Sequence, residues 1–218
     1  MEIKVMANIL EKNEQIAAQV KQTFDRHGIF AFNLLGSPGS GKTSLLEQTI
    51  KALHSEIRIA VIEGDLFTFK DAERIEAHGI PVVQINTGGG CHLDAAMVQN
   101  VLPRLPLSEL DMIVIENVGN LVCPAEFAVG EHVKVTVLSI TEGEDKPLKY
   151  PLMFKQSALA VLNKVDLLPY TNFDMAAAVH DITSINPSIQ LIQASCRTGD
   201  GLTGWFDWLR QQVQNIRK

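Results

Sequence analysis

The chain has 218 residues, a length typical of one sizeable α/β domain and short for two. Hydrophobic residues make up 46% and charged residues 20%, and the 15 Gly and 9 Pro are scattered, which argues against a disordered, collagen-like or coiled-coil chain. The formal net charge is -6 and Lys and Arg form no block, so we expect neither nucleic acid nor a membrane as a partner. The charged first segment does not resemble a signal peptide, and no stretch approaches the roughly 18 apolar residues of a membrane span, so we expect a cytoplasmic protein.

Short apolar runs alternate with amphipathic stretches along the chain. Apolar residues at helical spacing over 9–24 predict a leading helix, and we divide the chain into an N-terminal helix, 1–27, and one domain, 28–218. Strands are predicted over 29–35, 57–63, 80–86, 111–117, 133–140, 158–164 and 189–194, and helices over 44–53, 71–78, 92–102, 173–185 and from 202. Apolar strands joined by crossover helices predict a single α/β domain with a mostly parallel sheet flanked by helices, which binds ligands beyond the carboxyl ends of its strands.

A glycine-rich segment after the first predicted strand matches the P-loop pattern G-x-x-x-x-G-K-[ST] at the start of a helix. Glycines let backbone N–H groups turn inward around phosphates, and the helix N-terminus adds its positive dipole end. Lys42 would then reach the β- and γ-phosphates, and the Thr43 hydroxyl would bind Mg²⁺. The alternative is an ordinary glycine-rich turn. The predicted phosphate-binding residues are Gly36, Ser37, Pro38, Gly39, Ser40, Gly41, Lys42, Thr43 and Ser44.

Two later strand ends carry the features of a guanine site. Asn163, Lys164 and Asp166 form the pattern N-K-x-D after the sixth predicted strand. The Asp166 carboxylate only accepts hydrogen bonds and so suits the N1–H and N2–H₂ donors of guanine, while Asn163 can address the O6/N7 edge. Adenine lacks this donor pair, so the pattern predicts GTP. Ser195 and Cys196 follow the last strand, where a backbone N–H can bind the guanine O6; the alternative there is a plain strand-to-helix turn.

Acidic residues follow two further strands. The segment Glu116 to Gly119 is similar to the D-x-x-G of GTPases with Glu in place of Asp, so Gly119 would present its N–H to the γ-phosphate and Glu116 would orient Mg²⁺-bound water or the nucleophile. We therefore predict Lys42, Glu116 and Gly119 as the catalytic residues. For Asp71 a solvated loop acid is the alternative. The predicted Mg²⁺ residues are Thr43, Asp65, Asp71 and Glu116.

The three cysteines are odd in number and widely spaced, so we expect no disulfide framework. Cys91 and His92 are adjacent at the start of a predicted helix, whose N-terminal end favours a thiolate, and Cys123 lies four residues beyond Gly119. Two thiolates and an imidazole suit a borderline-soft metal, with a fourth position left for water or another subunit. The alternative is a set of buried, inert cysteines.

Together the segments GSPGSGKT, EGD, TGGGCHLDA, ENVGNLVCPA and NKVD resemble the HypB family of nickel-insertion GTPases over nearly the whole chain. The resemblance implies that 28–218 is a P-loop GTPase domain of the SIMIBI type that uses GTP and Mg²⁺. It implies nickel or zinc on Cys91, His92 and Cys123 at a dimer interface, and we expect this homodimer to form in the GTP state. The implied partners are a HypA-type metallochaperone and the [NiFe]-hydrogenase large-subunit precursor.

The sequence also suggests a mechanism and leaves competitors. Val118 to Cys123 joins the two sites, so the nucleotide would set metal affinity and subunit pairing, with slow, switch-like hydrolysis. A urease-accessory nickel GTPase and a GTPase chaperone of cobalamin enzymes are alternatives, but the cysteine-bearing loops favour HypB. A metal-binding module with a vestigial nucleotide site is disfavoured by the intact Lys42, Thr43 and Asp166.

Overall fold

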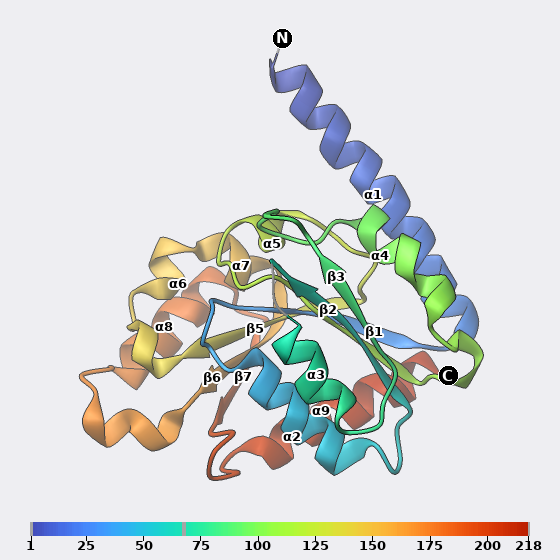
Figure 1. The fold of residues 1–218 in the computed structure, drawn as a ribbon. Helices are drawn as coiled ribbons and strands as arrows, with labels where there is room; N and C mark the ends of the chain where they lie inside the picture. The colour runs from blue at the N-terminus through green and yellow to red at the C-terminus, as the bar shows by residue number, and fades with distance from the viewer. Residues whose placement is uncertain (1, 67–68, 218) are drawn as a thin grey trace.

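This computed structural model describes residues 2–66 and 69–217, with side chains described from residue 10 onward. Its strands are β1 (Phe30–Leu35), β2 (Ile59–Asp65), β3 (Val82–Asn86), β4 (Met112–Glu116), β5 (Val133–Ser139), β6 (Ser157–Asn163) and β7 (Gln190–Ala194). They form one sheet in the order β3-β2-β4-β1-β5-β6-β7, with every neighbouring pair parallel (Figure 1). The predicted α/β class and parallel sheet are confirmed.

The helices confirm the predicted alternation and add short elements to it. The helices are α1 (Glu2–His27), α2 (Lys42–Leu53), α3 (Lys70–Glu76), α4 (Ala95–Val101), α5 (Cys123–Glu126), α6 (Lys146–Lys149), α7 (Pro151–Gln156), α8 (Met175–Ile185) and α9 (Leu202–Ile216), with 3-10 turns at Leu102–Arg104, Leu107–Glu109, Ile140–Glu142 and Val165–Tyr170. The fourth helix begins three residues later than predicted, because the Asp94 side chain accepts a hydrogen bond from the Met97 N–H at 2.7 Å and so caps the helix.

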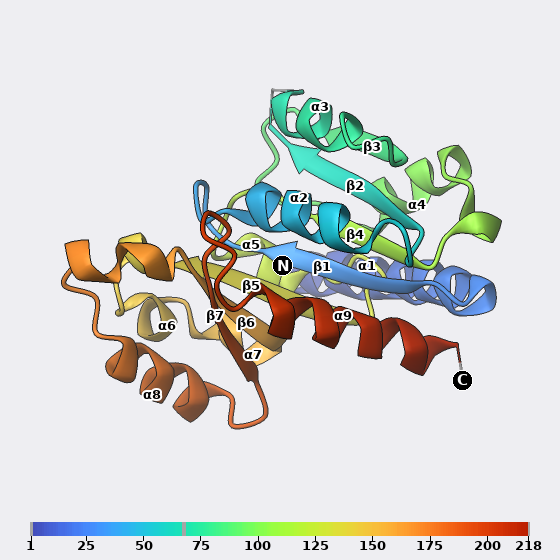
Figure 2. The same cartoon turned by 90° about the horizontal axis from the view of Figure 1, so that it is seen from below.

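Both faces of the sheet are covered by helices, as the alternation of side chains along β1 requires. Phe30, Phe32 and Leu34 point to one face and pack in a cluster with α2 and α9. Ala31 packs on the other face with α1 and α4, and Leu35 packs there with α7 and α8. Figure 2 shows α2 and α9 on the face away from α1 and α4. Every apolar residue of β1 is therefore buried, and the strand reads as a continuous apolar run.

The leading helix is longer than predicted and is fastened to the domain at its C-terminal half. Val20 and Phe24 are buried in the core. Gly130 has φ +94°, and a Cβ there would lie 2.3 Å from Val20 Cγ1, so only glycine allows this close approach. The N-terminal end of α1 projects beyond the body of the domain (Figure 1). The division of the chain at residue 27 stays a prediction.

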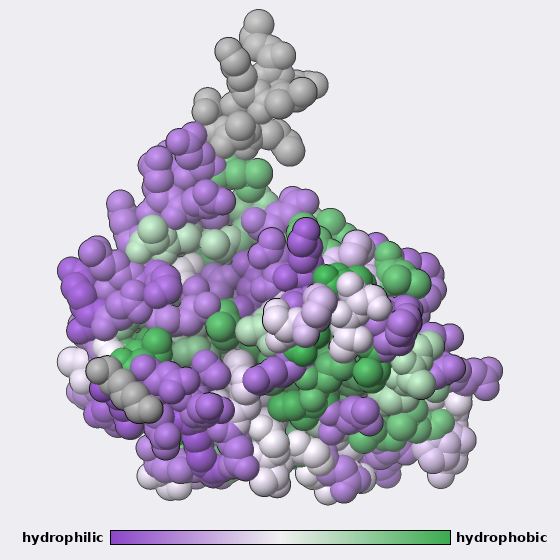
Figure 3. All heavy atoms as spheres, turned by 180° about the vertical axis from the view of Figure 1, so that it is seen from behind, coloured by the Kyte–Doolittle hydropathy of each residue, from purple (hydrophilic) through white to green (hydrophobic). Residues whose placement is uncertain are grey.

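One side of the surface is notably apolar. Seen from behind, hydrophobic side chains gather on the half of the molecule that carries α6, α7 and α8 (Figure 3). Leu148 and Leu152, on α6 and α7, are among the exposed large hydrophobic residues. Within the described residues no helix is both long and apolar enough to cross a lipid bilayer.

Asp111 is a buried acid at the amino-terminal edge of the sheet, directly before β4. Its carboxylate accepts hydrogen bonds from the Arg58 backbone N–H at 2.9 Å and from Arg58 Nη2 at 2.6 Å, and it also pairs with Arg217. These bonds, chiefly those to Arg58, hold the pKa of Asp111 below its usual range despite burial.

We expect Asp111→Ala to lower the free energy of unfolding at pH 7 by about 1.5–3 kcal/mol, the usual contribution of hydrogen bonds to a charged group. The exposure of both arginines favours the lower end. Because the pKa of Asp111 is lowered in the folded state, its contribution is present above the unfolded pKa near 3.8 and is lost as pH falls through the folded pKa. Urea unfolding from pH 7 down to 2 checks this, and a difference between the two proteins that grows on acidification would contradict it.

Candidate functional site

The glycine-rich segment joins β1 to α2 in a tight loop that only glycine permits. Gly36, Gly39 and Gly41 all have positive φ, at +150°, +76° and +99°. A Cβ on Gly36 would lie 2.4 Å from the Val137 carbonyl oxygen, and a Cβ on Gly41 would lie 2.3 Å from Asn163 Nδ2. The loop ends at Lys42, the first residue of α2, so the helix N-terminus faces the loop, as anion binding requires.

Lys42 and Thr43 are buried side chains that both point into this site. Lys42 Nζ donates hydrogen bonds to the carbonyl oxygens of Gly36 at 3.2 Å and Ser37 at 3.3 Å. The Thr43 hydroxyl donates to Glu116 Oε1 at 2.9 Å. The loop is also connected to the 3-10 turn after β5 through a hydrogen bond from the Ser37 hydroxyl to Glu142. A cationic amine and a buried hydroxyl thus lie together at the end of the loop.

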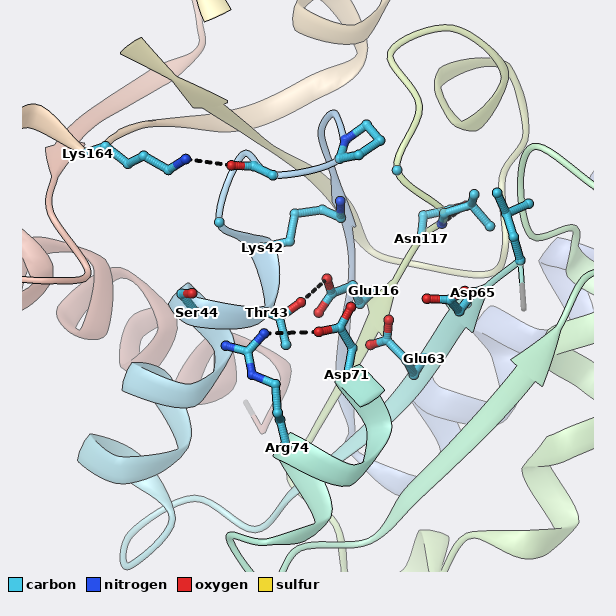
Figure 4. Close-up of a pocket in the computed structure, with 17 residues that line it drawn as sticks. Lys42, Thr43, Ser44, Glu63, Asp65, Asp71, Arg74, Glu116, Asn117 and Lys164 are labelled. Carbon is cyan, nitrogen blue, oxygen red and sulfur yellow. Dashed lines mark hydrogen bonds and ion pairs between the residues drawn. The ribbon is translucent and has the colours of Figure 1, made fainter. Parts of the chain in front are cut away.

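A cavity of about 460 Å³ opens in front of the loop at the carboxyl edge of the sheet (Figure 4). The predicted residues Pro38, Gly39, Gly41, Lys42, Thr43, Ser44, Asp65, Asp71, Glu116, Gly119 and Lys164 line it. The sequence analysis did not predict Glu63, Arg74 and Asn117, which line it as well. Loops that are far apart in the sequence therefore meet in one pocket, as a parallel sheet predicts.

Two of the acids form a buried pair. Glu63 and Glu116 are neighbours on β2 and β4, and each side chain is about 2% exposed. Burial and the nearby Glu116 carboxylate raise the pKa of Glu63 to about 11, and burial raises the pKa of Glu116. Oε2 of each has no hydrogen-bond partner among the described residues. Since carboxylate oxygens are the hard ligands that Mg²⁺ takes, this pair beside Thr43 fits a Mg²⁺ ion.

Helix α3 brings a further acid and a base to the rim of the cavity. Asp71 Oδ1 accepts a hydrogen bond from Arg74 Nη1 at 3.0 Å, and Arg74 Nη2 also donates to Glu47 Oε2 at 2.7 Å. Figure 4 shows Asp71 pointing toward Glu63 and Glu116, with the Arg74 guanidinium beside it. Asp65 lies at the end of β2 and lines the same cavity. The four predicted Mg²⁺ residues are thus brought together, and their roles toward the ion stay predictions.

A second cavity of about 310 Å³ adjoins the first and shares Gly41, Ser44 and Lys164 with it. Its lining includes the predicted base-site residues Asn163, Lys164, Asp166, Ser195 and Cys196. Lys164 is the one non-glycine residue with positive φ in the described chain, at +66°, and its Nζ donates to the Gly39 carbonyl at 2.6 Å. The Asp166 carboxylate accepts a hydrogen bond from the Ser195 hydroxyl at 2.6 Å, which orients it along the cavity.

Asn163 joins the loops of the second cavity to the phosphate loop. It is 1% exposed, and its Nδ2 donates to the Ser40 carbonyl at 2.9 Å while its Oδ1 accepts from the Cys196 N–H at 3.4 Å. Its expected contact with the O6/N7 edge of a base stays a prediction. Burial raises the pKa of the Cys196 thiol to about 11, so Cys196 is a neutral thiol within the loop.

The third group of residues is Cys91, His92 and Cys123, whose ligand atoms all lie within 4.8 Å of one another. Cys91 Sγ is 3.5 Å from His92 Nδ1, and the His92 ring stacks on Phe127 with a centroid distance of 4.0 Å. Burial lowers the pKa of His92, which favours the neutral imidazole that binds metals. Two thiols and a neutral imidazole fit nickel or zinc.

The expected effect of a helix end on Cys91 is wrong. Cys91 lies in the loop four residues before α4 begins at Ala95, and so it does not face the dipole of that helix. A hydrogen bond with Cys123 and partial burial instead raise the pKa of the Cys91 thiol. The alternative of buried, inert cysteines does not hold for Cys91, which is exposed.

A phosphate loop after the first strand, a basic residue and a buried hydroxyl within it, and acids at the neighbouring strand ends define a P-loop nucleotide-binding protein. A family model described as CobW/HypB/UreG, nucleotide-binding domain, matches residues 30–193. The hydrogenase maturation factor HypB of Escherichia coli (strain K12) is 50% identical over 210 residues, covering 96% of this chain and 72% of that protein. The chain belongs to the HypB branch of the CobW/HypB/UreG family.

Solved structures agree with this assignment. HypB from Archaeoglobus fulgidus superposes with a TM-score of 0.88 at 38% identity, covering 94% of this chain and 100% of that one. HypB from Helicobacter pylori in complex with nickel superposes with a TM-score of 0.88 at 33% identity, covering 94% and 96%. FtsY from Mycoplasma mycoides, at 15% identity and a TM-score of 0.55 over 76% of this chain and 60% of that one, shares the fold alone. The expected single α/β domain with a parallel sheet flanked by helices is confirmed.

Proposed function

We propose that the chain is a GTP-hydrolysing metallochaperone that delivers nickel to the [NiFe]-hydrogenase large-subunit precursor. The observation that carries the proposal is one chain in which a phosphate cavity adjoins an Asp166-lined base cavity and also bears a thiol–imidazole group. Two relatives support the proposed delivery of nickel to hydrogenase. The E. coli protein is named a hydrogenase maturation factor, and the H. pylori protein was solved in complex with nickel. The cargo ion is nickel or zinc on Cys91, His92 and Cys123.

The nucleotide is GTP because the second cavity offers an oriented carboxylate. Guanine N1–H and N2–H₂ can both donate to Asp166, which Ser195 holds in place, whereas adenine has no such donor pair. Lys164, with its amine on the Gly39 carbonyl, lies between the base and phosphate cavities. The base therefore enters beside α2 and its phosphates extend toward Lys42.

Hydrolysis would use residues already gathered in the phosphate cavity. Lys42 stabilises charge that develops on the β- and γ-phosphates, and the Gly119 N–H donates to the γ-phosphate. Glu116 would orient the attacking water. The Thr43 hydroxyl, which donates to Glu116 in this structure, would turn to the Mg²⁺ ion. Thr43, Asp65, Asp71 and Glu116 would hold Mg²⁺, which would supply neutralisation of the phosphate charge. We expect slow, switch-like turnover.

Three ligands per chain leave a coordination position open, and Cys91 is exposed. A two-fold contact can fill that position with a thiolate from a second copy, so we propose a homodimer in the GTP state that shares the metal. A HypA-type metallochaperone would supply the ion to this interface.

The test is light scattering during size exclusion with GDP or a non-hydrolysable GTP analogue, each with and without Ni²⁺. We expect a monomer with GDP and a dimer with the analogue plus Ni²⁺, because the nucleotide orders the surface that carries the metal ligands. Titration of the same samples with Ni²⁺ and Zn²⁺ gives the affinities in each state. A single mass under all four conditions would contradict the proposed dimer.

A further inference from the structure

The segment between Glu116 and Cys123 connects the nucleotide cavity to the metal ligands, and two asparagines on it reach the Cys91–His92 loop. Asn117 is 1% exposed and lies directly after β4. Its Oδ1 accepts hydrogen bonds from the Leu93 N–H and the Val118 N–H, both at 3.0 Å. Its Nδ2 donates to Asn33 Oδ1 at 3.1 Å, on the strand that leads into the phosphate loop. The residue after His92 is thus bonded to a residue that lines the nucleotide cavity.

Asn120 makes a second and more direct connection. Its backbone forms an isolated antiparallel bridge with Gly36, the first glycine of the phosphate loop. Its Nδ2 donates to the Cys91 carbonyl at 3.3 Å, and its Oδ1 accepts from the Val122 N–H at 2.8 Å, in the turn that leads to Cys123. One residue therefore contacts the phosphate loop, the carbonyl of one metal ligand and the approach to another.

The segment that carries Gly119 and Asn120 is closely packed against the phosphate loop. A Cβ on Gly119 would lie 2.9 Å from both the backbone nitrogen and Cγ of Pro38, so the backbone before Asn120 packs directly on the phosphate loop. Close-packed contacts transmit displacement because no void absorbs it. A γ-phosphate that draws Gly119 toward it would shift Asn120, and with it the Cys91 carbonyl and the Val122 turn.

We propose that Asn120, with Asn117 behind it, is the positioning residue through which the nucleotide sets the geometry of Cys91, His92 and Cys123. This inference rests on the proposed GTP-dependent control of the metal group and names the side chain that transmits it. Asn120 reaches the metal ligands through backbone groups, so its role is to place them and not to bind the ion. Its removal should uncouple the two sites while each still binds its own ligand.

Asn13 on α1 provides a matched control. Its Oδ1 accepts from the Ala95 N–H at 2.9 Å and its Nδ2 donates to the Ala128 carbonyl at 2.8 Å. It therefore joins the start of α4, beyond His92, to the backbone at Ala128, beyond Cys123, from the side of α1. Its hydrogen bonds go to neither the phosphate loop nor the segment from Glu116 to Cys123.

The first experiment measures Ni²⁺ affinity by competition with a chromophoric chelator, in GDP and in a non-hydrolysable GTP analogue. In the unmodified chain we expect the two dissociation constants to differ by at least about fivefold, the lower end of usual coupling between sites. In Asn120→Ala we expect their ratio to fall within about twofold of one, and in Asn13→Ala we expect it to remain, even if both affinities weaken together.

The second experiment needs no metal and measures the rate of Cys91 alkylation by mass spectrometry of the peptide that contains it. We expect this rate to depend on the bound nucleotide in the unmodified chain and in Asn13→Ala, but not in Asn120→Ala. Coupling that survives in Asn120→Ala in both measurements would overturn this inference and leave the proposed function standing. No coupling in the unmodified chain would overturn the proposed nucleotide control as well. Asn120 is half-buried, so the variant is expected to fold, and far-UV circular dichroism verifies this.

Discussion

Asp166→Asn is expected to exchange the preference for GTP for a preference for the xanthine nucleotide. The carboxylate accepts from guanine N1–H and N2–H₂, whereas xanthine carries a carbonyl at C2 that needs a donor, which the asparagine amide supplies. Sites that bond groups missing from a competitor discriminate by roughly 10⁴ to 10⁵, so the unmodified chain should bind GTP over ATP by a factor of that order. Competition of GTP, XTP and ATP measures all three affinities, against a fluorescent guanine nucleotide in the unmodified chain and against a fluorescent xanthine nucleotide in the variant.

Asp200→Asn is the matched control for this change. Asp200 lies in the loop after β7 that also carries Ser195, where its carboxylate accepts a hydrogen bond from the Thr198 hydroxyl at 2.7 Å. Asp200 does not line the base cavity. The control should keep the preference for GTP. Equal competition by ATP and GTP in the unmodified chain would show that the second cavity is not a guanine site.

The order of strands and helices could be predicted from the sequence because the central strands of the sheet are buried, although the edge strands β3 and β7 are partly exposed. Strands such as β1 and β4 bury every residue, so they appear as apolar runs, and the long helices between them carry one apolar face. The phosphate loop was equally predictable, since its glycines are required by contacts as close as 2.3 Å. The short helices α5, α6 and α7 were not predicted, because four to six residues are too few to show a helical period.

What the sequence could not predict depends on which strands are neighbours. Glu63 becomes part of the site because β2 lies beside β4, which sets it opposite Glu116 in register. The strand ends signal both acids, but only the sheet order pairs them. Arg74 lies in no motif, and Asn120 lies in the ENVGNLVCPA segment without a predicted role. Their positions follow from the packing of α3 against α2, where Arg74 pairs with Glu47, and from the bridge between Asn120 and Gly36.

Loss of either Cys91 or Cys123 should abolish tight Ni²⁺ and Zn²⁺ binding, whereas loss of Cys196 should leave it intact. Even outer partners of a metal ligand are usually worth 10- to 100-fold in affinity, so removal of a ligand itself should cost at least about 100-fold. Cys91 and Cys123 lie within 4.8 Å of His92, while Cys196 lines the base cavity as a neutral thiol and so offers a control of the same chemistry. Chelator competition with each alanine variant, alongside the thiolate-to-nickel charge-transfer absorption, measures the loss. A Cys196→Ala protein that lost the metal would show that the thiol in the base cavity binds the ion, and a Cys123→Ala protein that kept the metal would show that Cys123 does not. Either result would contradict the assignment of Cys91 and Cys123 to the metal and of Cys196 to the base cavity.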